Sequence, residues 1–77
     1  MTTMDRIAAH KAAHVIYAWH CVDYLPNTVS VAATVDVSGR GRFETIIVTE
    51  ATFEQTMRTL ADQCDALPGA GRKAKAA

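Results

Sequence analysis

The feature that most constrains the fold is the regular alternation of side chains along residues 28–37, TVSVAATVDV. Every second residue from Val29 to Val37 is valine or alanine, and the residues between them are small or polar. Neighbouring side chains of a β-strand point to opposite faces of its sheet. The pattern therefore predicts a strand with one buried face and one solvent-facing face.

The segment after this strand predicts a hairpin and then a helix. Residues 38–42, SGRGR, contain two glycines that can adopt the positive φ of a short hairpin loop, and residues 43–49, FETIIVT, predict the returning strand. Thr52 with Gln55 three positions later matches a capping box at the start of a helix. The apolar stripe of that helix recurs at spacings of four, three, four and three: Phe53, Met57, Leu60, Cys64 and Leu67. The Pro-Gly pair at 68–69 ends the helix.

The N-terminal half is less regular. Residues 1–14 predict a short, alanine-rich helix capped by Asp5 or Thr3. Residues 15–24, VIYAWHCVDY, favour a strand because β-branched and aromatic residues dominate, although a buried helix continuing from residue 5 fits the same apolar run.

The predicted fold class is therefore α+β. It consists of a short N-terminal helix, a three-stranded antiparallel meander, and one long C-terminal amphipathic helix packed on the valine face of the sheet. The alternative is an α-β-β-α order with residues 5–24 helical. We expect residues 1–69 to form a single domain and residues 70–77 to form a flexible basic tail.

Charge and cysteine content narrow the class of protein. Eight basic residues balance eight acidic ones, whereas a protein that grips nucleic acid by its phosphates normally carries a basic excess. Cys21 and Cys64 are too few to supply a four-ligand structural zinc site. The sequence shows no signal-peptide pattern and no apolar run near 18 residues. We therefore expect a cytoplasmic protein with no membrane contact.

Few residues suggest catalysis or metal binding. His10 and His14 are four apart, which on a helix places both imidazoles on one face, about 5–6 Å apart. They are the candidate metal ligands, but Lys11 stands where a zinc protease motif has glutamate, and we expect two solvated histidines. His20 and Cys21 are neighbours in a predicted strand, so their side chains diverge. The predictions are therefore no enzymatic activity and no cofactor.

The aromatic residues of the 15–24 stretch are the most informative surface. One helix can cover only one face of a sheet, so either Tyr17 and Trp19, or Ile16, Val22 and Tyr24, are left on the open face unless the N-terminal helix folds over them. An exposed aromatic patch on a small protein marks an interface.

These observations predict a small non-enzymatic protein–protein interaction module, acting as a homodimeric regulator or inhibitor of a larger complex. Phage-encoded inhibitors of bacterial defence systems have a similar size and composition, which is an analogy without a shared motif. The predicted partner-binding residues are Tyr17, Trp19, Tyr24, Arg40 and Arg42.

The alternative prediction is a nucleic-acid-binding accessory protein. Arg40 and Arg42 lie at the tip of the predicted hairpin, and a protruding basic hairpin can enter a nucleic-acid groove. The predicted tail adds three cations to them: Arg72, Lys73 and Lys75.

Overall fold

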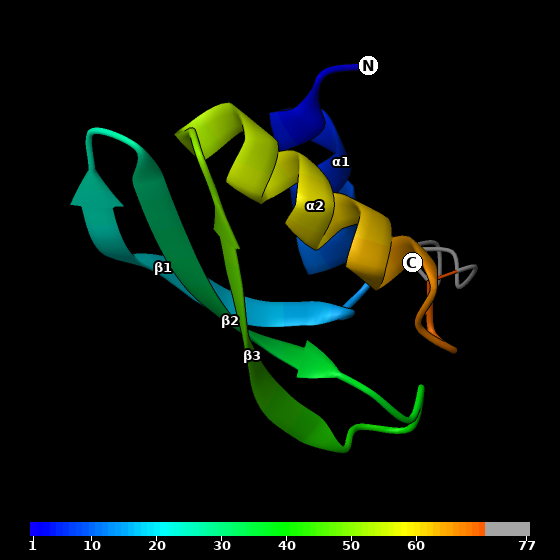
Figure 1. Ribbon diagram of the computed structural model, residues 1–77. Helices are drawn as coiled ribbons and strands as arrows, with labels where there is room; N and C mark the ends of the chain where they lie inside the picture. The colour runs from blue at the N-terminus through cyan, green and yellow to red at the C-terminus, as the bar shows by residue number, and fades with distance from the viewer. Residues whose placement is uncertain (71–77) are drawn as a thin grey trace.

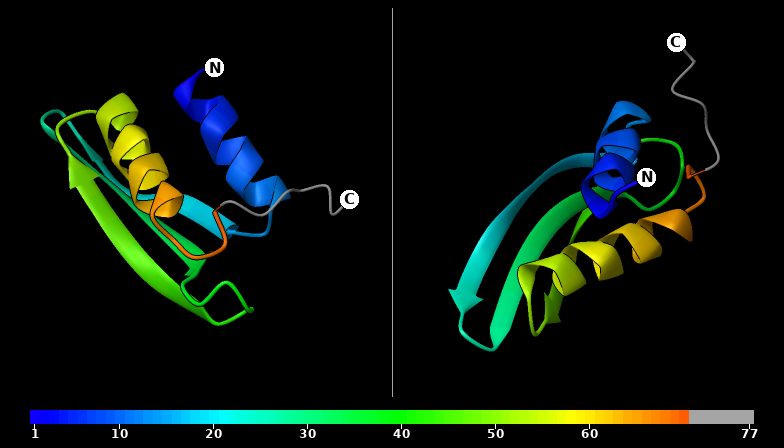
Figure 2. Two further views of the ribbon diagram at one scale, coloured as in Figure 1. Left: turned by 90° about the vertical axis from the view of Figure 1, so that its right-hand side faces the viewer. Right: turned by 90° about the horizontal axis from the view of Figure 1, so that it is seen from above.

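The computed structural model describes residues 1–70, which form a three-stranded sheet with a helix before it and a helix after it (Figure 1). The elements are, in order, α1 (Thr3–Ala12), β1 (Ile16–Leu25), β2 (Thr28–Asp36), β3 (Phe43–Glu50) and α2 (Phe53–Asp65). The strand order is β1-β2-β3 with both pairs antiparallel, and both helices lie on the same side of the sheet (Figure 2). The predicted α+β meander is confirmed, and the alternative with residues 5–24 helical is wrong.

Strand β1 departs from simple alternation at two places. The register with β2 shifts between Ile16 and Ala18 and again between Cys21 and Asp23. Tyr17 and Val22 are therefore the extra residues of two bulges. A bulge reverses the face on which the following side chains lie relative to strict alternation.

Helix α1 begins and ends differently from the prediction. Its N-cap is Thr2, whose hydroxyl accepts the Asp5 N–H while the Asp5 carboxylate accepts the Thr2 N–H. Neither Asp5 nor Thr3 is the cap, because this reciprocal pair already satisfies the first turn. The helix ends at Ala12, and His14 has φ +63°, the left-handed conformation common just after a helix.

Helix α2 begins at the predicted cap. The Thr52 hydroxyl accepts the N–H of Gln55 at 3.1 Å. The core-facing stripe includes one polar side chain, since the buried Thr56 hydroxyl donates to the carbonyl oxygens of Val29 and Thr52, each at 2.8 Å. The apolar residues that α2 buries completely are Met57, Leu60, Ala61 and Cys64. The predicted stripe is confirmed for Met57, Leu60 and Cys64. Phe53 and Leu67 are only partly buried against the core, and Leu67 lies past the end of the helix.

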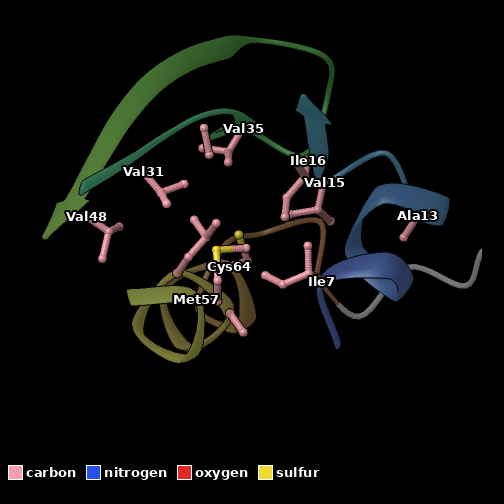
Figure 3. Close-up of a cluster of buried hydrophobic side chains, with 12 residues drawn as sticks. Ile7, Ala13, Val15, Ile16, Val31, Val35, Val48, Met57 and Cys64 are labelled. Atoms are coloured by element: carbon pink, nitrogen blue, oxygen red, sulfur yellow. The ribbon is translucent and has the colours of Figure 1, made fainter. Parts of the chain in front are cut away.

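The core lies between the valine face of the sheet and the two helices. Figure 3 shows Ile7 of α1 directed into the same cluster as Met57 and Cys64 of α2, with Val31 and Val35 of β2 on the sheet side. Burial raises the pKa of the Cys64 thiol to about 11, so the role of this side chain is to pack in the core.

Polar contacts join the two helices at the rim of this core. His10 Nε2 donates to Asp65 Oδ1 at 2.8 Å, and Arg6 contacts both Asp62 and Asp65. The hydrogen bond from His10, reinforced by Arg6 against the opposing effect of burial, holds the pKa of Asp65 below its usual value. Helix α1 is therefore fixed by Ile7 inside and by these charged groups outside.

Candidate functional site

The sheet face opposite the helices is uncovered by any element of residues 1–70, and we call it the open face (Figure 2). The register assigns to it the β2 residues between the core valines and the β1 and β3 residues paired with them. These β2 residues are Thr28, Ser30, Ala32, Thr34 and Asp36. The N-terminal helix packs beside α2 and leaves this face uncovered.

Large apolar side chains are exposed on the open face, among them Leu25, 55% exposed and paired with Thr28 at the end of β1. Tyr17 is 71% exposed, Ile47 is 65% exposed and Phe43 is 41% exposed. The Tyr17 and Phe43 rings meet edge to face with centroids 5.8 Å apart, although they come from opposite edges of the sheet. They can do so because only the short Thr34 and Asp36 side chains of the central strand lie between them. Ile47 lies on the same face of β3, with Thr45 between it and Phe43.

The rest of the open face is neutral and hydroxyl-rich. The Ser30 and Thr49 hydroxyls lie 2.8 Å apart, and those of Thr34 and Thr45 lie 3.4 Å apart, both as cross-strand pairs. Within residues 1–70, Asp23 is the one carboxylate that the register leaves on this face besides Asp36, whose carboxylate is turned into the following loop. A partner would therefore meet aromatic, aliphatic and hydroxyl groups with little charge to desolvate.

The bulges of β1 separate the aromatic residues that the sequence grouped together. Tyr17 lies on the open face, whereas Trp19 and Tyr24 pair with the core-side residues Ala33 and Val29. The expectation that Tyr17 and Trp19, or Ile16 and Tyr24 with Val22, share the open face is wrong. Its premise was unbroken alternation, and the two extra residues break it.

Trp19 and Tyr24 instead form a second cluster with Phe53 at the start of α2. The Phe53 ring lies 6.3 Å from Trp19 and 6.4 Å from Tyr24, the latter nearly stacked. Tyr24 and Phe53 also line a hollow of about 330 Å³ beside the β1–β2 turn, with Pro26 and Val29. Trp19 is half-buried against the core, so its main role is packing.

The arginine loop is organised by a buried carboxylate. Asp36 is 2% exposed, and its oxygens accept the N–H groups of Ser38, Gly39 and Gly41 at 2.9–3.1 Å. Burial alone would raise the pKa of Asp36, but the bonds from Gly41, Ser38 and Gly39 together outweigh burial and lower it to about 2. Gly39 and Gly41 have φ of +77° and +93°, as the glycine pattern predicted.

This loop holds Arg40 and Arg42 at the surface with different surroundings. Arg42 lies 3.4 Å from the Glu44 carboxylate, and both side chains are largely exposed. Arg40 is exposed. The three tail cations of the nucleic-acid alternative, Arg72, Lys73 and Lys75, lie outside the described residues. Glu44 lowers the local positive potential at the hairpin tip.

The two candidate metal ligands do not share a helix face. His14 follows the end of α1, and His10 is buried against Asp65. Across residues 1–70 no group of three or more histidine, cysteine or acidic side chains could hold a metal ion together. His20 and Cys21 point to opposite sides of the sheet, as expected of strand neighbours.

Sequence reasoning missed Phe43 and Ile47. The signal was present, because Phe43, Thr45 and Ile47 alternate with the core-side Ile46 and Val48. No family model, curated protein or solved structure matches this chain. Neither helix in the described part is long and apolar enough to cross a membrane.

Proposed function

We propose that this protein is a non-enzymatic protein–protein interaction module, a regulator or inhibitor of a larger complex, that binds its partner with the open face of the sheet. The observation that carries the proposal is the exposure of Tyr17, Phe43 and Ile47 together on an otherwise neutral face. Large apolar side chains gathered on the surface of a small protein are typical of binding sites.

The chemistry of the face defines the class of partner. Rings and branched aliphatic chains supply binding energy when buried, and the surrounding hydroxyls supply adaptable hydrogen bonds. The neutral face gives little electrostatic selection, so the complementary surface is a protein surface that is apolar at its centre and uncharged at its rim. Phosphate groups would meet no lysine or arginine side chain of β1, β2 or β3 on this face, and His20 is its one basic group within those strands.

The test compares two tyrosines that are equally exposed on opposite sides of the sheet. Tyr17 and Tyr24 are each 71% exposed, and Tyr24 lies on the helix side. Affinity capture from the native host is performed with the tagged wild type and with the Tyr17→Lys, Ile47→Lys and Tyr24→Lys variants. Circular dichroism confirms the fold of each.

We expect a stoichiometric partner to be retained by the wild type and by Tyr24→Lys and to be lost from Tyr17→Lys and Ile47→Lys. A buried tyrosine or isoleucine contributes about 1.5–3 kcal/mol, so each change should weaken binding by at least about tenfold. Equal loss from Tyr17→Lys and Tyr24→Lys, or loss only from Tyr24→Lys, would reject the open face as the binding site.

A further inference from the structure

The outer edge of β3 is an unprotected strand edge. On the side away from β2, β3 has no neighbouring strand among residues 1–70. Its eight residues pair with β2 in unbroken register, and they include no proline, lysine or bulge. Natural proteins use prolines, lysines and bulges to prevent pairing at exposed strand edges. A regular edge without them presents unpaired N–H and C=O groups to other strands.

The opposite edge of the sheet shows the contrast. Strand β1 carries bulges at Tyr17 and Val22, which disrupt the ladder that an added strand would need. Strand β3 instead has β-branched residues from Thr45 to Thr49. Ile46, although on the helix side, is only partly buried against the core. The β3 edge is therefore suited to pairing with another strand, and such pairing would bury more of the Ile46 side chain.

The side of helix α2 that lies next to β3 also favours pairing at this edge, because its side chains are uncharged. The charged α2 side chains that contact α1 are Glu54, Asp62 and Asp65. Thr59 lies on the other side of α2, where its hydroxyl donates to Glu50 of β3 at 3.0 Å. Gln55 and Gln63, one turn before and one turn after Thr59, continue that side. The part of α2 beside the β3 edge is therefore uncharged.

We infer that the β3 edge pairs with the β3 edge of a second copy of this chain, giving an antiparallel six-stranded sheet. Antiparallel pairing of identical edges requires a twofold axis perpendicular to the sheet, so all four helices share one face. Paired residues must then point to the same face, which places the axis through a residue rather than between two. Near the middle of β3 the candidates are Thr45, Ile46 and Ile47.

Charge selects among these registers. With the axis at Ile47, Glu44 faces Glu50 of the other copy, and like charges directly opposite each other are destabilising. With the axis at Thr45, the strands overlap over only residues 43–47. With the axis at Ile46, Arg42 faces Glu50 of the other copy at both ends, and the two Ile46 side chains meet. We therefore assign the axis to Ile46.

This inference is independent of the proposed partner on the open face. It places the interface of the homodimer predicted from the sequence at the β3 edge. Pairing at Ile46 puts Thr45 opposite Ile47 of the other copy, both on the open face. The open faces of the two copies join into one continuous surface.

The first test is a charge swap followed by sedimentation between about 1 and 200 µM. The wild type should sediment at twice the 8.3 kDa chain mass. Arg42→Glu and Glu50→Arg should each raise the dimer Kd about tenfold, because each change alters two symmetry-related pairs. The double variant should recover the wild-type Kd. Arg40→Glu, in the same loop but outside the paired register, is the matched control and should leave Kd unchanged.

The second test fixes the register by cysteine cross-linking in a Cys21→Ser background, since Cys21 is exposed and Cys64 is buried. Thr45→Cys and Ile47→Cys proteins of different mass are oxidised separately and as a mixture. Directly opposite residues have Cβ atoms about 4.5–5.5 Å apart, within reach of a disulfide, whereas diagonal ones lie about 7–8 Å apart. We expect a disulfide in the mixture and little in either protein alone.

Each alternative result overturns the inference. A monomer at 200 µM rejects the dimer, while leaving the open-face capture experiment as a separate test of the proposed function. A dimer that neither charge reversal weakens rejects the β3 edge. Strong self-linking of Ile47→Cys alone or of Thr45→Cys alone rejects the axis at Ile46.

Discussion

Helix α1 has one large fully buried side chain, and its truncation tests how firmly the helix is held. Ile7 is 1% exposed and contacts the cluster formed by β2 and α2. Replacing a buried isoleucine by alanine costs about 2–5 kcal/mol, from lost burial and from the cavity left behind. We expect about 3 kcal/mol for Ile7→Ala, since alanine preserves the helix propensity and the site lies at the seam between two helices.

This cost is a large part of the total stability. A domain of this size is stable by about 4–11 kcal/mol. In urea, with a slope of about 1 kcal/mol per molar, the unfolding midpoint of Ile7→Ala should fall by about 3 M. The matched control is Met4→Ala, which truncates a large apolar residue of the same helix that is 42% exposed, and it should cost less than about 1.5 kcal/mol.

The assay is urea unfolding followed by far-ultraviolet circular dichroism, with amide hydrogen exchange to locate the change. A loss below about 1 kcal/mol, or one equal to that of Met4→Ala, would refute the role assigned to Ile7. Loss of exchange protection in α1 alone, with the sheet still protected, would show that the helix detaches before the core unfolds. The docking energy of α1 would then be smaller than the truncation cost.

Three further outcomes are expected at the turns. Because its pKa is lowered to about 2, Asp36 should add stability above pH 4 that is lost as the pH falls towards 2, and acid unfolding of Asp36→Asn should be flatter in that window. Gly39→Ala should cost more than the roughly 1–2 kcal/mol of strain expected for Gly41→Ala in thermal unfolding, because its Cβ would also lie 3.2 Å from Pro68; equal costs would contradict that contact. His14→Gly should stabilise the protein by up to about 1 kcal/mol by relieving φ +63°, and a lower melting temperature would argue against strain there.

The sequence was informative where local chemistry decides structure. The valine alternation of β2, the two glycines of the loop and the stripe of α2 each depend on neighbours within a few residues. The end of α1 was missed because His14 takes a conformation normally marked by glycine or asparagine. No composition signal distinguishes Tyr17 and Val22 as bulges, since what fixes them is the register imposed by β2.

The candidate site was harder to predict than the fold, because it depends on which sheet face each helix covers. The short α1 could have covered the open face, and its position beside α2 follows from contacts between distant residues, Arg6 and His10 with Asp65. Tyr17 was identified for its exposure, but the grouping with Trp19 failed at the first bulge. Phe43 and Ile47 could have been found by applying to residues 43–49 the alternation already used for β2.

The two proposed surfaces are geometrically linked, and this gives a test that neither offers alone. Arg42 and Glu50 lie on the helix side of the sheet, whereas Tyr17 belongs to β1, on the edge away from the proposed pairing, and its side chain lies on the open face. Tyr17→Lys should therefore abolish partner capture without changing the dimer mass. Arg42→Glu leaves the open face intact but separates its two copies, so it should weaken capture by a multivalent complex through lost avidity and spare binding to a single isolated subunit. If Arg42→Glu weakened capture by the complex and binding to the single subunit equally, the loop would itself contact the partner. The β3 edge and the open face would then not have separate roles.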